Sequence, residues 1–176
     1  VQYAWAMGGR RIFLLGASGT IGQATAAALT ARGHEVVALV RSAPGLHPQA
    51  IAARQRLRAM PGLVLREGDP LRLESLRQDG LCGERFDTWV SCLASRTGSP
   101  ADAWAVDHAA HVQALHACRA AGVEQVVLLS ALCVQKPRLA FQQAKLAFEA
   151  ELIASGLNHS IVRPTAFFKS LSGQVQ

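Results

Sequence analysis

Short aliphatic runs alternate with alanine-rich stretches along the whole chain, and this alternation is the strongest constraint on its fold. It is typical of a parallel β-sheet whose two faces are both covered by helices. We predict strands over residues 11–15, 35–40, 63–66, 86–91, 125–129 and 159–163. We predict helices over residues 21–31, 49–60, 71–78, 102–121 and 139–155. The sequence therefore predicts an α/β domain with a doubly wound sheet.

Three glycines follow the first predicted strand at the mouth of the first helix. Gly16, Gly19 and Gly22 stand in the sequence G-A-S-G-T-I-G. In such a turn the first glycine permits a sharp bend, the second lets the backbone approach a pyrophosphate, and the third lets the helix pack closely. The helix N-terminus would then hold the anion. Other candidate cofactor-binding residues of this turn are Ser18, Thr20 and Ile21.

This motif and its context favour a Rossmann-like dinucleotide-binding fold with strand order 3-2-1-4-5-6. The G-x-x-G-x-x-G spacing resembles that of the short-chain and extended dehydrogenase/reductase families. Three incidental glycines in a loop are the alternative interpretation.

The end of the second predicted strand reads Val40-Arg41-Ser42. A site selective for NAD usually has an acidic residue there, which binds the ribose 2′-hydroxyl. A guanidinium instead forms charge-assisted, bidentate bonds to a 2′-phosphate. We therefore predict NADP(H) as the cofactor, with Arg41 as the main discriminator and Ser42 as a second donor. A solvated loop arginine is the alternative.

Further candidate cofactor-binding residues follow the third, fourth and sixth strands. Asp69 stands where such folds usually contact the adenine, and a role as a cap before Pro70 is compatible with that. The carboxyl ends of the strands border the cleft in this fold, so residues directly after them are expected to line it. These residues are Leu93, Ala94, Ser95 and, toward the nicotinamide, Pro164.

The sequence Phe141-Gln-Gln-Ala-Lys145 has the four-residue spacing of a catalytic Tyr–Lys pair, but Phe stands in the place of the Tyr. In short-chain reductases a Tyr and a Lys four residues later share a helical face, and the Lys favours ionisation of the phenol. A phenylalanine donates no proton, so carbonyl reduction by a tyrosine acid is disfavoured. We predict that Lys145 binds the nicotinamide ribose and that Ser130 is a second catalytic residue. A lysine at the surface and a serine that merely ends a strand are the alternatives.

Three blocks of the chain resemble the family of 8-vinyl-reductases that act on divinyl chlorophyllide or protochlorophyllide. They are VSCLASRTG (90–98), LLSALCVQKPRLAFQQAKLAFEAEL (128–152) and SIVRPTAFFKSLSGQV (160–175), and the resemblance extends over about residues 11–176. Members of this family are atypical short-chain reductases that carry Phe in place of the usual Tyr. The resemblance implies reduction of the 8-vinyl group to ethyl by NADPH, with the conjugated macrocycle as the electron sink.

The same resemblance gives expectations for the substrate and the domains. Phe167 and Phe168 would form an apolar wall for a tetrapyrrole, and Lys136 would pair with a pigment carboxylate. Core aromatics and a solvated lysine are the alternatives. From its own sequence, VQYAWAMGG, the segment 1–9 is expected to be a leader, and residues 10–176 are expected to form the NADP(H)-binding domain. Family members are longer, so we expect the C-terminal substrate portion to be absent.

Two other functions stay open at this point. An isoflavone-reductase-like enzyme would use NADPH on another substrate. A non-catalytic sensor of the nitrogen-regulator-like type would bind NADP, and the absent Tyr fits such a protein as well. Lys145 and the three long blocks argue against the sensor.

Composition bounds the partners and the compartment. The chain has 18 Lys and Arg against 12 Asp and Glu, which favours anionic ligands. Arg54, Arg56 and Arg58 spread around a predicted helix, so we expect no nucleic-acid partner. No apolar run is long enough to span a bilayer, although an amphipathic pigment suits peripheral association with a photosynthetic membrane. We predict a bacterial cytoplasmic protein, because no transit peptide is recognised and the composition is rich in Arg and Ala. The sequence does not indicate an oligomeric state.

Cysteine and histidine patterns do not predict a metal site. The four cysteines lack C-x-x-C spacing, so reduced and mostly buried thiols are expected. Asp107, His108, His111 and His116 share one predicted helix, and an ordinary polar helix face is favoured there over a weak metal site.

Overall fold

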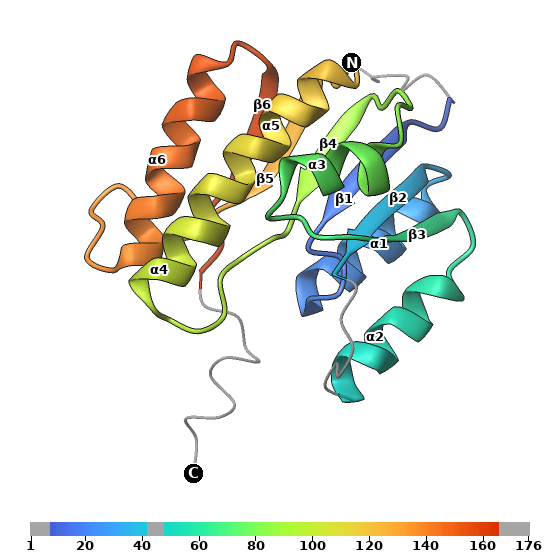
Figure 1. Ribbon diagram of the computed structural model, residues 1–176, viewed down its shortest axis with the longest axis horizontal. Coiled ribbons are helices and arrows are strands. Elements are labelled where there is room, and N and C mark those ends of the chain that lie inside the picture. Colours follow the sequence, from blue (N-terminus) through green and yellow to red (C-terminus); the bar gives the residue numbers. More distant parts are fainter. Residues whose placement is uncertain (1–7, 42–47, 166–176) are drawn as a thin grey trace, which may run out of the picture.

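The computed structural model describes residues 8–41 and 48–165, and a single six-stranded parallel sheet organises them. The strands are β1 (Arg11–Leu15), β2 (Glu35–Val40), β3 (Leu63–Glu67), β4 (Thr88–Ser91), β5 (Gln125–Leu129) and β6 (Asn158–Val162). Their order across the sheet is β3-β2-β1-β4-β5-β6 (Figure 1). This order confirms the predicted doubly wound topology, in which the direction of winding reverses between β1 and β4.

Eight helical segments connect the strands within the described residues. They are α1 (Thr20–Ala31), α2 (Pro48–Arg58), α3 (Leu73–Ser75), η1 (Leu76–Leu81), α4 (Pro100–Ala103), η2 (Trp104–Ala109), α5 (Ala110–Ala120) and α6 (Ala140–Ala154). The segments η1 and η2 are π-helical. The predicted helices are therefore in the right places, but two of them contain π-helical turns that were not predicted.

The helix predicted over residues 102–121 begins earlier and changes its geometry part-way. Its start lies at Pro100 because the Ser99 hydroxyl oxygen accepts the Asp102 N–H at 3.2 Å. Serine at the N-cap and proline at the first helical position both favour this start. The π-helical turn η2 follows directly, and it carries Asp107 into the interior.

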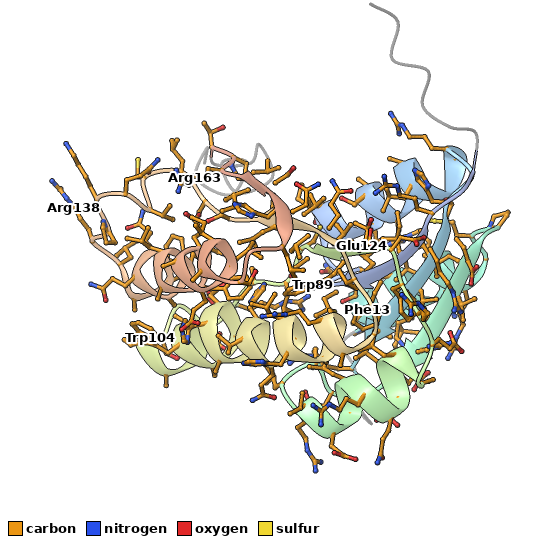
Figure 2. All side chains as sticks on the ribbon, turned by 90° about the horizontal axis from the view of Figure 1, so that it is seen from above. Phe13, Trp89, Trp104, Glu124, Arg138 and Arg163 are labelled. Carbon is orange, nitrogen blue, oxygen red and sulfur yellow. The ribbon has the colours of Figure 1, made fainter. Side chains whose placement is uncertain are left out.

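Residues that alternate along the central strands pack on opposite faces of the sheet. Phe13 and Leu15 pack with residues of η1, α5 and α6, whereas Ile12 and Leu14 pack with residues of α1 and α2. Figure 2 shows Phe13 and Trp89 in the interior of the molecule. Because helices cover both faces, the buried residues of β1 and β2 form continuous runs instead of an alternating pattern.

Of the four cysteines, only Cys118 is buried. Cys92 is half-buried, and Cys82 and Cys133 are exposed. The expectation of mostly buried thiols is therefore wrong. The two exposed cysteines both have positive φ values, so they lie in turns rather than in packed helices or strands.

Two surface features bear on possible partners. In the part of the chain that the structure describes, no helix combines the length and the apolar character needed to cross a membrane.

On α2, Arg54 and Arg58 both pair with Glu67, and Arg56 donates to the side chain of Gln23 at 3.0 Å. These three arginines are therefore engaged within the fold.

Candidate functional site

The glycine turn between β1 and α1 has the geometry that its motif predicts. Gly16 has a φ of +79°, and a Cβ there would lie 2.4 Å from the carbonyl carbon of Cys92. A Cβ on Gly22 would lie 2.1 Å from the carbonyl oxygen of Gly16. Gly19 is the N-cap of α1, and a Cβ on it would come no closer than 3.4 Å to the Gly16 oxygen. The first and third glycines therefore allow close packing, and the second leaves open space at the helix N-terminus.

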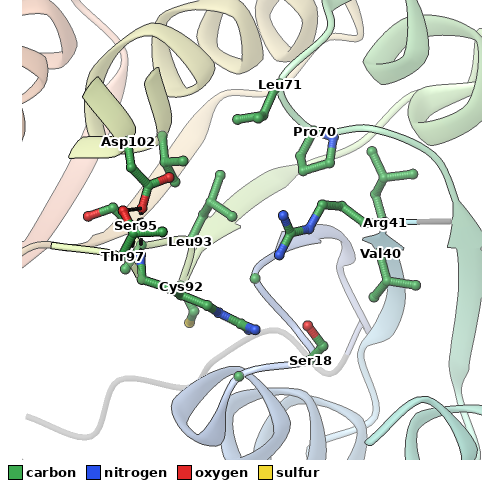
Figure 3. Close-up of a pocket in the computed structure, with 16 residues that line it drawn as sticks. Ser18, Val40, Arg41, Pro70, Leu71, Cys92, Leu93, Ser95, Thr97 and Asp102 are labelled. Atoms are coloured by element: carbon green, nitrogen blue, oxygen red, sulfur yellow. Dashed lines mark hydrogen bonds between the residues drawn. The ribbon is translucent and has the colours of Figure 1, made fainter. Parts of the chain in front are cut away.

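A cavity of about 400 Å³, here called the first cavity, opens beside this turn at the carboxyl ends of the strands (Figure 3). The guanidinium of Arg41, at the end of β2, points into it, and Ser18 lies on the side of the glycine turn (Figure 3). Pro70 and Leu71 after β3 and the segment 92–97 after β4 form other walls. The positive end of α1 and Arg41 suit this cavity to a phosphate-bearing ligand.

Seven of the fourteen predicted cofactor-binding residues line the first cavity. Those that line it are Gly16, Ser18, Gly19, Arg41, Leu93, Ala94 and Ser95. The first turn of α1 beside it contains Thr20, Ile21 and Gly22. Ser42 lies outside the described residues.

Asp69 is near the first cavity but does not line it. Its Oδ1 accepts the Leu71 N–H at 3.0 Å, and its own N–H donates to the Ser75 hydroxyl at 2.7 Å. This geometry is that of a turn-stabilising residue, and the neighbouring Pro70 and Leu71 form the wall instead.

A second cavity, of about 550 Å³, adjoins the first and shares the segment 94–96 with it. It is lined by Ser130 after β5, by Phe141 and Lys145 of α6, and by Pro164 after β6. The fold thus brings together the two predicted catalytic residues, the phenylalanine that replaces the usual tyrosine, and a predicted nicotinamide contact. The two cavities form neighbouring compartments at one edge of the sheet.

The Ser130 hydroxyl is a buried polar group that lines the second cavity. It has no hydrogen-bond partner among the described residues. A buried hydroxyl without a partner is costly, so this group is suited to bond a ligand in the cavity.

Of the three predicted substrate contacts, Lys136 lies within the described residues. Lys136 is exposed in the loop between β5 and α6 and lines neither cavity. Phe167 and Phe168 lie outside the described residues.

A buried polar network joins the two cavities, and sequence reasoning missed its central residue. Asp107 is 1% exposed; its Oδ1 lies 2.9 Å from Lys145 Nζ, and its Oδ2 accepts the Ser95 hydroxyl at 2.5 Å. Lys145 is 7% exposed, so it is not a solvated surface lysine. An acidic residue in the apolar sequence AWAVDHAAHV was the available signal, because a buried carboxylate requires a cationic partner.

His111 supports the segment after β4 from the same helical region. Its Nδ1 lies 2.8 Å from the Val106 carbonyl oxygen, and its Nε2 lies 2.8 Å from the Ser91 hydroxyl. A carbonyl only accepts, so Nδ1 carries the proton and Nε2 accepts from Ser91. Burial, reinforced by the positive charge of Lys145, lowers the pKa of His111 to about 4. The ring is therefore neutral near pH 7.

The burial of Asp107 and His111 corrects the expectation of an ordinary polar helix face. Both side chains point inward because the π-helical turn η2 and α5 pack them against Lys145 and Ser91. Both ring nitrogens of His111 are engaged within the fold, and the described residues contain no group of three or more potential metal ligands among His, Cys, Asp and Glu.

Comparison with known protein families agrees with this geometry. Residues 16–176 match the model of a family described as NAD(P)H-binding. The chain belongs to this NAD(P)H-binding family. Its cofactor is therefore a nicotinamide dinucleotide, as the glycine turn predicts.

Curated relatives of this NAD(P)H-binding chain confirm the resemblance drawn from its sequence blocks. Divinyl chlorophyllide a 8-vinyl-reductase, chloroplastic, of Cucumis sativus is 43% identical over 171 residues, which cover 94% of this chain and 41% of that protein. The protein of the same name from Arabidopsis thaliana is 40% identical over 172 residues, again covering 94% of this chain and 41% of the relative. The chain thus spans about two fifths of the length of these relatives.

The names of these relatives contradict the prediction of a bacterial cytoplasm. Those relatives are labelled chloroplastic. The prediction failed because overall composition does not encode a compartment, and because the start of the sequence is no evidence for or against a targeting segment.

Solved structures with the same fold belong to several enzymes. The Bordetella bronchiseptica enzyme WbmH in complex with NAD+ matches with a TM-score of 0.71 at 23% identity, covering 89% of this chain and 56% of that one. An isoflavone reductase matches with a TM-score of 0.71 at 21% identity, covering 94% of this chain and 52% of that one. These likenesses confirm the Rossmann-like fold.

The turn geometry predicts different effects for two glycine substitutions. Gly22→Ala would force a Cβ against the Gly16 carbonyl, so we expect a loss of about 3 kcal/mol in the free energy of unfolding. Gly19→Ala has room for its Cβ, so it should keep the stability but weaken nicotinamide-cofactor binding at the helix N-terminus. Urea denaturation and fluorescence titration measure the two quantities. Equal stability losses in both variants would contradict this account.

The environment of His111 predicts that acid destabilises the protein. Between its ordinary pKa of 6.5 and about 4, the unfolded chain binds a proton at His111 that the folded protein does not bind. The free energy of unfolding should therefore fall as the pH falls through this window, by up to about 3 kcal/mol from this residue. Urea denaturation at a series of pH values measures it.

Two variants assign this effect to His111. His111→Asn should reduce the slope between pH 6.5 and 4, whereas His116→Asn, an exposed position on the same helix, should retain it. An unchanged slope in His111→Asn would show that other groups cause the acid sensitivity.

Proposed function

We propose that this chain is the NADPH-binding part of an 8-vinyl-reductase that converts the 8-vinyl group of divinyl chlorophyllide or protochlorophyllide to ethyl. The observation that carries the proposal is the 43% identity to the Cucumis sativus enzyme along 94% of this chain. The second cavity supports it, because Phe141 and Lys145 stand together there without a tyrosine acid. Reduction of a carbon–carbon double bond needs no proton delivered to a carbonyl oxygen.

The preference for NADPH over NADH is the second part of the proposal. Arg41 extends from the end of β2 into the first cavity, and the residue that an NAD-selective enzyme would have there is acidic. A 2′-phosphate next to Arg41 would receive charge-assisted hydrogen bonds. Ser42 is the proposed second donor, and it follows Arg41 directly in the sequence.

When bound, NADPH supplies a hydride. The chain's own residues bind and orient the reactants in this proposal: the glycine turn binds the pyrophosphate, and Lys145 donates to the nicotinamide ribose. Phe141 and Pro164 provide apolar surface that excludes water from the second cavity. The Ser130 hydroxyl, which lacks a partner among the described residues, donates to the ligand in that cavity.

The expected contacts with the pigment are kept as part of the proposal. Phe167 and Phe168 would border the macrocycle, and Lys136 would pair with a pigment carboxylate at the exposed loop. Peripheral association with a photosynthetic membrane suits an amphipathic substrate.

Substitution of Arg41 tests the cofactor preference. Arg41→Ala should weaken NADPH binding about tenfold to a hundredfold, because charge-assisted hydrogen bonds contribute about 1.5–3 kcal/mol. NADH affinity should change little. Calorimetric titration measures both affinities, and Arg138→Ala, at an exposed position that lines neither cavity, is the matched control. Equal affinity of the unaltered protein for the two cofactors would refute the assignment.

A fusion protein tests the vinyl reduction itself. In it, this chain replaces the matched segment of the Cucumis sativus enzyme, which supplies the remaining three fifths of that protein. With NADPH and divinyl chlorophyllide, we expect the pigment to gain two hydrogen atoms in mass and to shift in absorption. A fusion that folds and binds NADPH tightly but reduces no pigment would favour the NADP-binding sensor, and reduction of a different substrate would favour the isoflavone-reductase-like enzyme.

A further inference from the structure

Asp107 occupies a position that neither the glycine motif nor the Phe141–Lys145 pattern explains. It comes from the π-helical turn η2, and its carboxylate is buried at the junction of the two cavities. One oxygen pairs with Lys145, which lines the second cavity, and the other bonds to Ser95, which lines both cavities. Asp107 itself lines the second cavity.

The charges explain why this contact orients the lysine. A buried ammonium needs a compensating charge, and Asp107 supplies it at 2.9 Å. An ammonium has three N–H donors, and the bond to Asp107 uses one of them. The bond to Asp107 fixes the orientation of the ammonium, so its two other N–H groups point in other directions around Nζ. The open space beside them is the second cavity, which Lys145 borders.

The absence of a tyrosine at position 141 changes what the charge of Lys145 can do. Where a phenol stands four residues before the lysine, the positive charge of the lysine favours ionisation of that phenol. Phe141 has nothing to ionise, and the charge of Lys145 is instead balanced by Asp107. Lys145 can therefore act by donating hydrogen bonds to a ligand in the second cavity.

We propose that Asp107 is a positioning residue that holds the ammonium of Lys145 toward the nicotinamide ribose and ties it, through Ser95, to the wall of the first cavity. This inference rests on the proposed binding of NADPH across the two cavities. It assigns Asp107 to the nicotinamide half of the cofactor and not to the adenosine half.

The chain offers a matched control for a buried carboxylate. Glu149 of α6 is also 1% exposed and pairs with a basic side chain, that of Arg163, but Glu149 lines neither cavity. Replacing either acid by its amide removes one buried negative charge and leaves a cation without its partner. Both variants lose a buried charge, so a difference in ligand binding between them is caused by the location of Asp107 at the second cavity.

The test uses two probes, NADPH and adenosine 2′,5′-bisphosphate, which lacks the nicotinamide ribose. In Asp107→Asn we expect NADPH affinity to fall about tenfold and the affinity for the bisphosphate to stay unchanged. In Glu149→Gln we expect both affinities to stay unchanged while the midpoint of thermal unfolding falls. The variant Lys145→Met should match Asp107→Asn, and the double variant should lose little more, because the two residues act together.

Three results would overturn the inference: no change in NADPH affinity in Asp107→Asn, an equal loss for both probes, or additive losses in the double variant. If Asp107→Asn does not fold, Asp107→Glu replaces it, because the longer carboxylate keeps the charge but displaces the ammonium, and the same selective loss is expected. Failure of the unaltered protein to bind NADPH would instead refute the proposed function, so the two failures are distinguishable.

Discussion

The close approach of α1 to the turn after β1 is the contact on which the rest of the site depends. A side chain at Gly22 would collide with the Gly16 carbonyl, and one at Gly16 would collide with the backbone after β4. With both positions free of a Cβ, the N-terminus of α1 is brought to the point where the sheet reverses its winding. There the loops after β1, β2, β3 and β4 surround one cavity. The backbone packing of two glycines thus places a positive helix end beside Arg41.

The segment after β4 connects this phosphate-binding side with the chemistry of the second cavity. It lines the first cavity along residues 92–97 and the second along residues 94–96. The neutral ring of His111 bonds to the Ser91 hydroxyl, which accepts the Leu93 N–H, and the carboxylate of Asp107 accepts the Ser95 hydroxyl. Lys145 is bound to the same carboxylate. Two sets of buried hydrogen bonds, one around His111 and one around Asp107, thus support the segment that the two cavities share.

The features that were predictable from the sequence are those with a local or periodic signal. The strand order follows from alternating strands and helices, the turn from its three glycines, and the convergence of Ser130, Lys145 and Pro164 from their places at strand ends and on one helix face. Asp107 was missed because the face that a helix residue presents depends on packing, and here a π-helical turn changes that face. The local role foreseen for Asp69 is present, since its carboxylate accepts the Leu71 N–H within its own turn, and the adenine contact stays a prediction.

We propose that one nicotinamide cofactor spans both cavities, with its pyrophosphate at the glycine turn and its nicotinamide beside Lys145. A crystal structure of the protein with bound NADP+ tests this most directly. We expect the 2′-phosphate at Arg41, the pyrophosphate at the N–H groups around Gly19, and the nicotinamide ribose within hydrogen-bond distance of Lys145 Nζ. A nicotinamide outside the cavity that Phe141 and Lys145 line, with Nζ bonded to Asp107 alone, would contradict it.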